Sequence, residues 1–126
     1  MTTHPFRAAV EARDLPAMID QLTPDVTFHS PILFNPFEGR DATGMVLAAV
    51  LRVLEDFRYT DDLTGEGTHA LVFEARVGDR QVQGLDLLRL DADGLIEDFT
   101  VMVRPLSAAH AVRDAMAREL AASGSA

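Results

Sequence analysis

Hydrophobic and polar residues alternate along most of the second half of the chain, with the period of two that β-strands require. The alternation predicts four strands, at roughly 57–64, 69–77, 80–90 and 95–104. The turns that separate them contain glycine and lie at 65–67, 78–79 and 91–94. Turns this short make neighbouring strands antiparallel. An earlier alternating stretch predicts a further strand from Val26 to Ser30, which Pro31 ends.

Apolar residues that recur every three or four positions predict four helices. The helical segments are 5–13, 15–22, 41–55 and 107–121. Side-chain oxygens can accept hydrogen bonds from the free amides of a first helical turn. The residues expected to do so are Thr3, Asp14, Asp41 and Ser107. Residues 122–126 should fray.

The order of elements predicts one α+β domain, with helices on one face of a curved antiparallel sheet. A chain of 126 residues can bury one good core, so we expect a single domain over 1–126, ordered from about 3 to 121. The segment 32–40 is an apolar loop that contains Phe34 and Phe37. Such a loop is expected to lie over a cavity or against a partner.

Charge and composition exclude several classes of function. Twenty acidic residues against eleven basic ones give a net charge of −9, which repels nucleic acids and anionic membrane surfaces. The absence of cysteine excludes disulfides, thiolate metal sites and cysteine nucleophiles. The chain has no apolar run long enough to span a membrane, and its start lacks the pattern of a secretory signal. We therefore expect a cytoplasmic protein.

Asp86 is the main chemical candidate, because it lies inside the apolar run Leu85 to Leu88. If the turn between the strands 80–90 and 95–104 has four residues, Asp86 lies opposite Phe99. A two-residue turn would give Asp86 a different partner but would leave the same residues on each face of the sheet. Asp86 therefore shares a face with Phe99, Val101 and Val103, unless an odd loop with a bulge intervenes.

A carboxyl group in such surroundings has a raised pKa through loss of hydration. Asp86 could then donate a hydrogen bond as a neutral acid or act as a base near neutral pH. The alternative is a structural residue, paired with an arginine or with backbone amides. Gly84 either leaves a flat surface for a ligand or marks a bulge. Tyr59 could offer its hydroxyl to a ligand, whereas most of the aromatic residues could equally be ordinary core.

The chain resembles the nuclear transport factor 2-like superfamily, and more narrowly its SnoaL-like members. The segments that carry this resemblance are EARDL at 11–15, LTPDVTFHSP at 22–31, FEGRDA at 37–42 and LRLDADGLI at 88–96. The resemblance implies a cone-shaped fold, in which a bent sheet wraps around helices and a pocket opens at the wide end. It also implies a homodimer through the outer face of the sheet. The residues expected to line the pocket are Phe6, Phe28, Ser30, Phe34, Phe37, Tyr59, Phe73, Gly84, Asp86, Phe99, Val101 and Val103.

Ketosteroid isomerases of this superfamily use an aspartate base, a tyrosine and a protonated aspartate. By position, the protonated acid falls on Asp86, the base falls on Ser30 and the tyrosine falls on Phe6. Two of the three groups are thus replaced, which argues against that mechanism. The acid that the superfamily's epoxide hydrolases need on the last strand is also missing from 99–102.

Histidine suggests three further kinds of site. His29 could shuttle protons, but alternation turns it away from Ser30 and favours a hydrogen-bonded structural or interface role. A triad of Ser30, His29 and Asp86 is rejected because adjacent strand residues point apart. The histidines lack the close spacing of metal ligands, so no metal is expected.

These observations leave two hypotheses. The first is an isomerase, cyclase or lyase that needs no cofactor, takes an apolar small molecule and uses Asp86 as its acid or base. The second is a non-catalytic module for ligand binding or dimerisation, in which Asp86 is structural or anchors a ligand.

Overall fold

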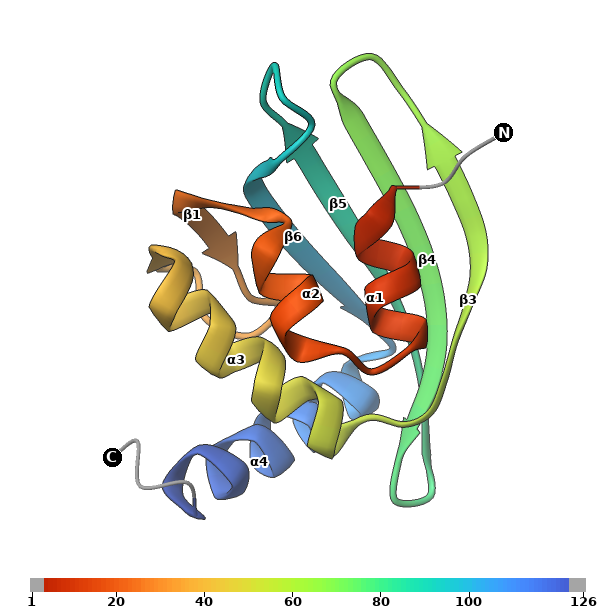
Figure 1. Ribbon diagram of the computed structural model, residues 1–126. Helices are drawn as coiled ribbons and strands as arrows, with labels where there is room; N and C mark the ends of the chain where they lie inside the picture. The colour runs from red at the N-terminus through yellow and green to blue at the C-terminus, as the bar shows by residue number, and fades with distance from the viewer. Residues whose placement is uncertain (1–3, 123–126) are drawn as a thin grey trace.

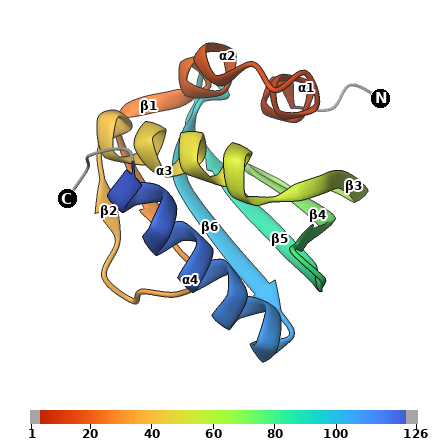
Figure 2. The ribbon, with the colours of Figure 1, turned by 90° about the horizontal axis from the view of Figure 1, so that it is seen from below.

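The protein is a curved sheet of six strands with all four helices on one side (Figures 1 and 2). The computed structural model describes residues 4–122. The helices are α1 (Pro5–Glu11), α2 (Leu15–Asp20), α3 (Arg40–Val53) and α4 (Leu106–Ala122). The strands are β1 (Leu22–His29), β2 (Phe37–Glu38), β3 (Glu55–Thr64), β4 (Thr68–Val77), β5 (Arg80–Leu90) and β6 (Ile96–Arg104). The predicted α+β class and the single-sided helices are confirmed.

The strands are ordered β2-β1-β6-β5-β4-β3, and all neighbours are antiparallel except β1 and β6. β2 was not predicted, because two residues are too few to show any alternation. Its Phe37 pairs with Phe28 of β1. β1 begins at Leu22, earlier than predicted, and its pairing with β6 is irregular between Leu22 and Thr27. The irregular stretch accommodates Pro24, which has no amide hydrogen to donate.

The starts of the helices confirm one predicted cap and correct two. The Ala17 amide donates to Asp14 Oδ1 at 3.1 Å, as predicted. Asp41 does not cap α3, which begins one residue earlier and follows Gly39, whose φ of 95° suits a residue without a side chain. Ser107 likewise lies inside the first turn of α4. The predicted caps therefore fail where the helix begins before the polar residue.

His4 caps the first helix. Its Nδ1 accepts a hydrogen bond from the Phe6 amide at 3.1 Å, and its Nε2 lies 2.8 Å from the Gly94 carbonyl oxygen. The two contacts fit the neutral ring with its proton on Nε2, because Nδ1 must accept. Thr3, the predicted cap, lies outside the described residues, as does the expected frayed end apart from Ala122.

The register between β5 and β6 decides which side chains face the helices. Residues 91–95 form the loop, and the register shifts by one between Arg89 and Leu90. Compared with the predicted pairing, the five-residue loop displaces the partners by one residue and the register shift displaces them by one more. A total displacement of two residues leaves every side chain on its predicted face, because side chains alternate with a period of two. Asp86 lies opposite Val101, not Phe99, but it shares the inner face with both. The expectation that an odd loop with a bulge would exchange the faces was wrong.

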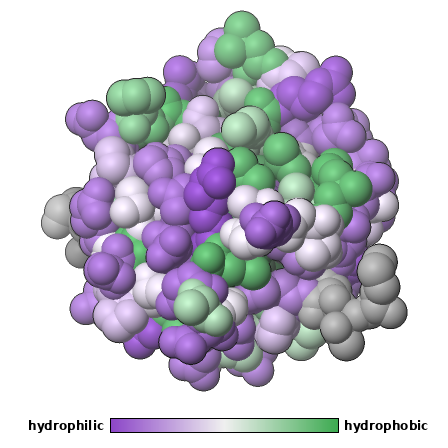
Figure 3. All heavy atoms as spheres, turned by 90° about the horizontal axis from the view of Figure 1, so that it is seen from above, coloured by the Kyte–Doolittle hydropathy of each residue, from purple (hydrophilic) through white to green (hydrophobic). Residues whose placement is uncertain are grey.

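The core fills the space between the helices and the concave face of the sheet. Its most deeply buried large side chains are Phe6, Phe28, Phe99, Met18, Leu22, Leu71, Leu88 and Ile96. Viewed from above, the surface carries small groups of hydrophobic side chains between hydrophilic ones (Figure 3). No helix within residues 4–122 is both long enough and apolar enough to cross a membrane.

Candidate functional site

Asp86 lies in the middle of β5 and faces the helices. Its side chain is buried, with 6% of the residue exposed, and its neighbours in the adjacent strands are Leu71 and Val101. Burial raises the pKa of Asp86 to about 7, because a charged carboxylate loses its hydration there. At neutral pH this residue can therefore both accept and release a proton.

Tyr59 of β3 is the hydrogen-bond partner of Asp86. Its hydroxyl donates to Asp86 Oδ2 at 3.3 Å. This bond favours the charged carboxylate and so lowers the pKa of Asp86, whereas burial, the larger effect, raises it. Burial, followed by the negative charge of Asp86, raises the pKa of Tyr59 far above its ordinary value. Tyr59 therefore stays a neutral donor across the physiological pH range.

The sequence had suggested Tyr59 as a group for a ligand but had not paired it with Asp86. The resemblance placed the tyrosine of the ketosteroid isomerases on Phe6, which left Asp86 without a hydroxyl. The structure supplies that hydroxyl from another strand: Tyr59 pairs with Phe73 of β4, and Phe73 pairs with Gly84 of β5. The sequence feature that could have predicted this contact is the position of Tyr59 on the same face of the sheet as Asp86, two strands away.

A cavity of about 730 Å³ lies in front of this pair. Ten of the predicted lining residues line it: Phe6, Phe28, Ser30, Phe37, Tyr59, Phe73, Asp86, Phe99, Val101 and Val103. The sequence reasoning missed the contribution of the helices, which includes Met18, Val46, Leu47, Val50, Val112 and Met116. Apart from Leu47, their helical spacing predicts that they are buried, but it does not distinguish a cavity wall from solid core.

Gly84 does not line the cavity, which corrects the prediction. A Cβ built on Gly84 would stand 2.1 Å from Phe73 Cζ, so the ring of Phe73 covers this glycine. Gly84 therefore provides space for an aromatic side chain of the protein and not for a ligand. The alternative of a bulge is also wrong, because the pairing of Gly84 with Phe73 and with Val103 is regular.

Phe34 also lies outside the cavity, with 97% of the residue exposed. The reason is a turn held by Ser30, whose Oγ accepts hydrogen bonds from the amides of Leu33 at 2.9 Å and Ile32 at 3.3 Å. The turn places Ile32 and Leu33 at the cavity and carries Phe34 past it. Ser30 lines the cavity, but its hydroxyl oxygen is already occupied.

His29 is separate from the pair of Asp86 and Tyr59. Its Nε2 lies 2.9 Å from Asp98 Oδ1, and the residue does not line the cavity. The contact agrees with the structural interpretation of His29 and gives Ser30 no histidine partner. Within residues 4–122 no three His, Asp or Glu side chains gather as the ligands of a metal would.

The polar groups of the cavity divide into an interior pair and a charged rim. Asp86 and Tyr59 lie inside, whereas the charged residues of the lining are exposed: Glu11, Arg13, Asp56, Arg58 and Arg113. An apolar body would fill the interior, with one polar atom against the pair. The arrangement can bind such a molecule and exchange a proton with it.

Comparison with known proteins agrees with this architecture. The family model of the SnoaL-like domain matches residues 4–99. The crystal structure of a steroid delta-isomerase from Pseudomonas aeruginosa is 40% identical, covers 94% of this chain and 88% of its own, and has a TM-score of 0.90. An uncharacterized protein with a cystatin-like fold from Silicibacter pomeroyi is 34% identical, with 93% and 86% covered and a TM-score of 0.87.

A SnoaL-like protein of unknown function from Burkholderia thailandensis is 17% identical, covers 80% of this chain and 90% of its own, and has a TM-score of 0.66. At this identity the likeness concerns the fold alone. No curated protein matches the sequence.

Proposed function

Since this chain belongs to the SnoaL-like domain family, we propose that it is an isomerase-type enzyme that needs no cofactor and acts on an apolar carbonyl compound. The observation that carries the proposal is the buried pair of Asp86 and Tyr59 facing an apolar cavity. The 40% identical protein that bears the name steroid delta-isomerase supports the same type of reaction. Fold alone would not decide it, because one fold hosts many functions.

In the proposed reaction Asp86 moves a proton between two carbon atoms of the substrate. The Asp86 carboxylate removes a proton from the carbon beside the carbonyl group, and the electron pair of that C–H bond forms an enolate. The neutral Asp86 then returns the proton to a carbon further along the conjugated system, so the double bond moves and no electrons are gained or lost. Once Asp86 is protonated, the Tyr59 hydroxyl is released to donate to the enolate oxygen.

A non-catalytic binding protein is the second candidate, and the composition of the lining favours it. Among the described residues the other lining carboxylates, Glu11 and Asp56, are exposed at the rim, and Ser30 is held in its own turn. Within residues 4–122, Asp86 is therefore the one buried acid, and no second buried acid could share the proton transfer. In this case Asp86 and Tyr59 would anchor a ligand oxygen and transfer no proton.

Turnover of β,γ-unsaturated cyclic ketones distinguishes the two candidates. Ketones of one to four fused rings are offered, and the absorbance of the conjugated product is followed. We expect Asp86→Asn to lose at least about 100-fold in turnover, the contribution typical of a positioned acid or base. Asp98→Asn is the matched control, because Asp98 is a histidine-bonded carboxylate that does not line the cavity. Undiminished turnover by Asp86→Asn, or binding by the wild type without turnover, would favour the binding protein.

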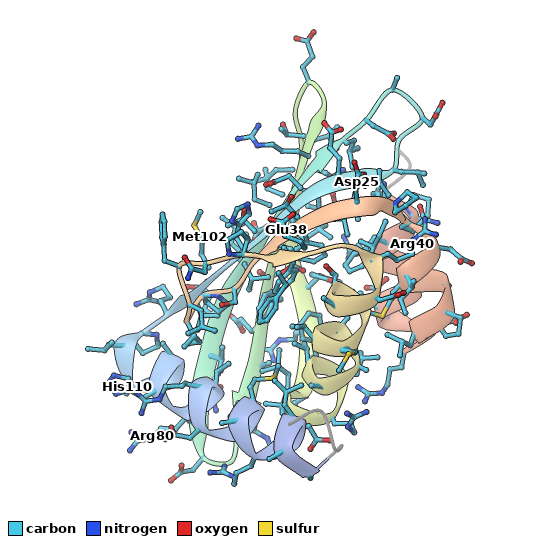
Figure 4. The ribbon with its side chains drawn as sticks, turned by 90° about the vertical axis from the view of Figure 1, so that its left-hand side faces the viewer. Asp25, Glu38, Arg40, Arg80, Met102 and His110 are labelled. Atoms are coloured by element: carbon cyan, nitrogen blue, oxygen red, sulfur yellow. The ribbon has the colours of Figure 1, made fainter. Side chains whose placement is uncertain are left out.

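We also propose that a second copy of the chain covers the outer face of the sheet. Leu85 of β5 and Met102 of β6 are register partners on that face, and Met102 is 50% exposed. Figure 4 shows Met102 on the side of the sheet that is turned away from α4. With Val72 and Arg104, the two residues line a shallow hollow of about 300 Å³. An apolar hollow with a polar border suits the interface of a homodimer.

A further inference from the structure

Arg7 of α1 lies over the ring of Tyr59. Its Cζ is 5.6 Å from the centroid of that ring, the distance of a cation–π contact. Phe57 meets the same ring edge to face, with the centroids 4.9 Å apart. Arg7 does not itself line the cavity. It touches the lining through the ring of Tyr59 and, at the exposed rim, through Glu11.

Carboxylates from two elements hold the Arg7 guanidinium in place, and a residue of a third element holds one of them. Its Nη1 donates to Asp62 Oδ2 of β3 at 2.8 Å, and its Nε donates to Glu11 Oε2 of α1 at 3.4 Å. The other carboxylate oxygen of Asp62 is hydrogen-bonded to His69 of β4, whose side chain is only 4% exposed. The guanidinium is therefore anchored to the sheet through Asp62, which is itself hydrogen-bonded to a buried side chain.

We infer that Arg7 is a positioning residue that acts through Tyr59: it holds the tyrosine ring from outside the cavity and so keeps the hydroxyl on Asp86. A role of Arg7 in catalysis rests on the proposed function, whereas its effect on the hydrogen bond between Tyr59 and Asp86 does not. The charged or titratable groups that face Tyr59 are Arg7 and Glu11 from α1 and Asp86 from β5. Loss of Arg7 removes the cation–π contact with the ring, and the hydrogen bond of Tyr59 to Asp86 weakens.

The chain contains one tyrosine and no tryptophan, so absorbance and fluorescence at tyrosine wavelengths report on Tyr59 alone. In the wild type, titration from pH 5 to pH 9 should give one change of the tyrosine signal as Asp86 ionises, and Asp86→Asn should abolish it. In Arg7→Gln we expect the midpoint to rise by about 0.5 pH unit or more, because the bond that favours the carboxylate is weakened. Arg7→Lys keeps the charge and should recover part of the shift.

Two further variants control for general damage to the fold. Arg52→Gln removes another arginine–carboxylate pair, with Glu119, that has no contact with Tyr59, and its midpoint should equal that of the wild type. Asp62→Asn leaves Arg7 in place but removes its anchor, so its midpoint should rise as well. Circular dichroism at each pH verifies that the variants are folded.

A midpoint that stays at the wild-type value in folded Arg7→Gln or folded Asp62→Asn would overturn the inference, whatever the activity. An upward shift in both variants, absent in Arg52→Gln, supports it. The proposed function fails on a different result, namely turnover that does not depend on Asp86. The two failures are therefore distinguishable.

Discussion

The ring of Phe73 lies against Gly84, in the space that any side chain at position 84 would need. The two residues are register partners in β4 and β5, and Tyr59 pairs with Phe73 from the other side. The tip of the Phe73 ring thus reaches from β4 onto β5, the strand that carries the acid. Glycine at position 84 leaves the space that the Phe73 ring occupies, two residues before Asp86.

Gly84→Ala should therefore damage both stability and the site. The new methyl group would fall 2.1 Å from Phe73 Cζ and would push the ring towards the cavity. We expect the free energy of unfolding to drop by about 1–3 kcal/mol, the usual effect of overpacking. Urea denaturation measures this loss. The double variant Gly84→Ala with Phe73→Leu should recover part of it, whereas additive losses would show that the two residues are not coupled.

Stability should fall with rising pH because of Asp86. Its pKa is about 7 in the folded protein against an ordinary value of 3.8, so the folded state holds a proton that the unfolded chain has released. The stabilisation is complete below about pH 4 and is lost as the pH rises through 7, with a total on the order of 4 kcal/mol.

The difference in unfolding free energy between Asp86→Asn and the wild type isolates this effect, since other groups cancel in it. Relative to the asparagine variant, the wild type should become less stable between pH 5 and pH 8. A difference that stays constant over that range would mean that Asp86 is already ionised in the fold at pH 5.

Tyr59→Phe should raise the pKa of Asp86 further. The hydroxyl favours the charged carboxylate, so its removal leaves burial unopposed, and we expect an upward shift of up to about 1 unit. The carbon-13 resonance of the Asp86 carboxyl group, followed against pH, gives the midpoint directly. The midpoint of the pH dependence of any turnover should move to higher pH as well. An unchanged midpoint would show that the 3.3 Å contact is absent in solution.

Met102→Glu should separate the proposed dimer into monomers. The substitution places a charge opposite Leu85 in the hollow of the outer face, where two copies would bury it without a partner. Sedimentation velocity at micromolar concentration measures the change. Met45→Glu is the matched control, because Met45 is also 50% exposed but lies on α3. A wild type that sediments as a monomer would remove the proposal.

Alternation of side chains sufficed to predict which way Asp86 faces. That prediction needed only the hairpin of β5 and β6, in which a short loop couples neighbouring strands. The contact with Tyr59 could not be predicted in the same way, because it depends on two strand pairings in succession. One of them is irregular on both sides of Tyr59, between Glu55 and Arg58 and between Tyr59 and Asp61. Local patterns do not specify such shifts.

Hydrophobicity misplaced Phe34 for a related reason. Its apolar character predicts burial, but the chain path is decided by the hydrogen bonds of Ser30 to the amides that follow it. Those bonds form between neighbours in the chain and leave Phe34 beyond the cavity edge. The lining contributed by α3 and α4 escaped prediction because it depends on how far the helices stand from the sheet, which periodicity does not specify.

The position of β3 at the edge of the sheet gives the two partners of the site different mobility. β5 is paired on both sides, whereas β3 is paired with β4 alone and is irregular around Tyr59. Edge segments open at a lower free energy than central ones, so amide hydrogens beside Tyr59 should exchange with solvent faster than those beside Asp86. The hydroxyl can therefore leave the acid through a local opening of β3, while the rest of the sheet stays folded. Asp86 thus stays in place within the central strand β5, whereas Tyr59 can move away with the edge strand β3.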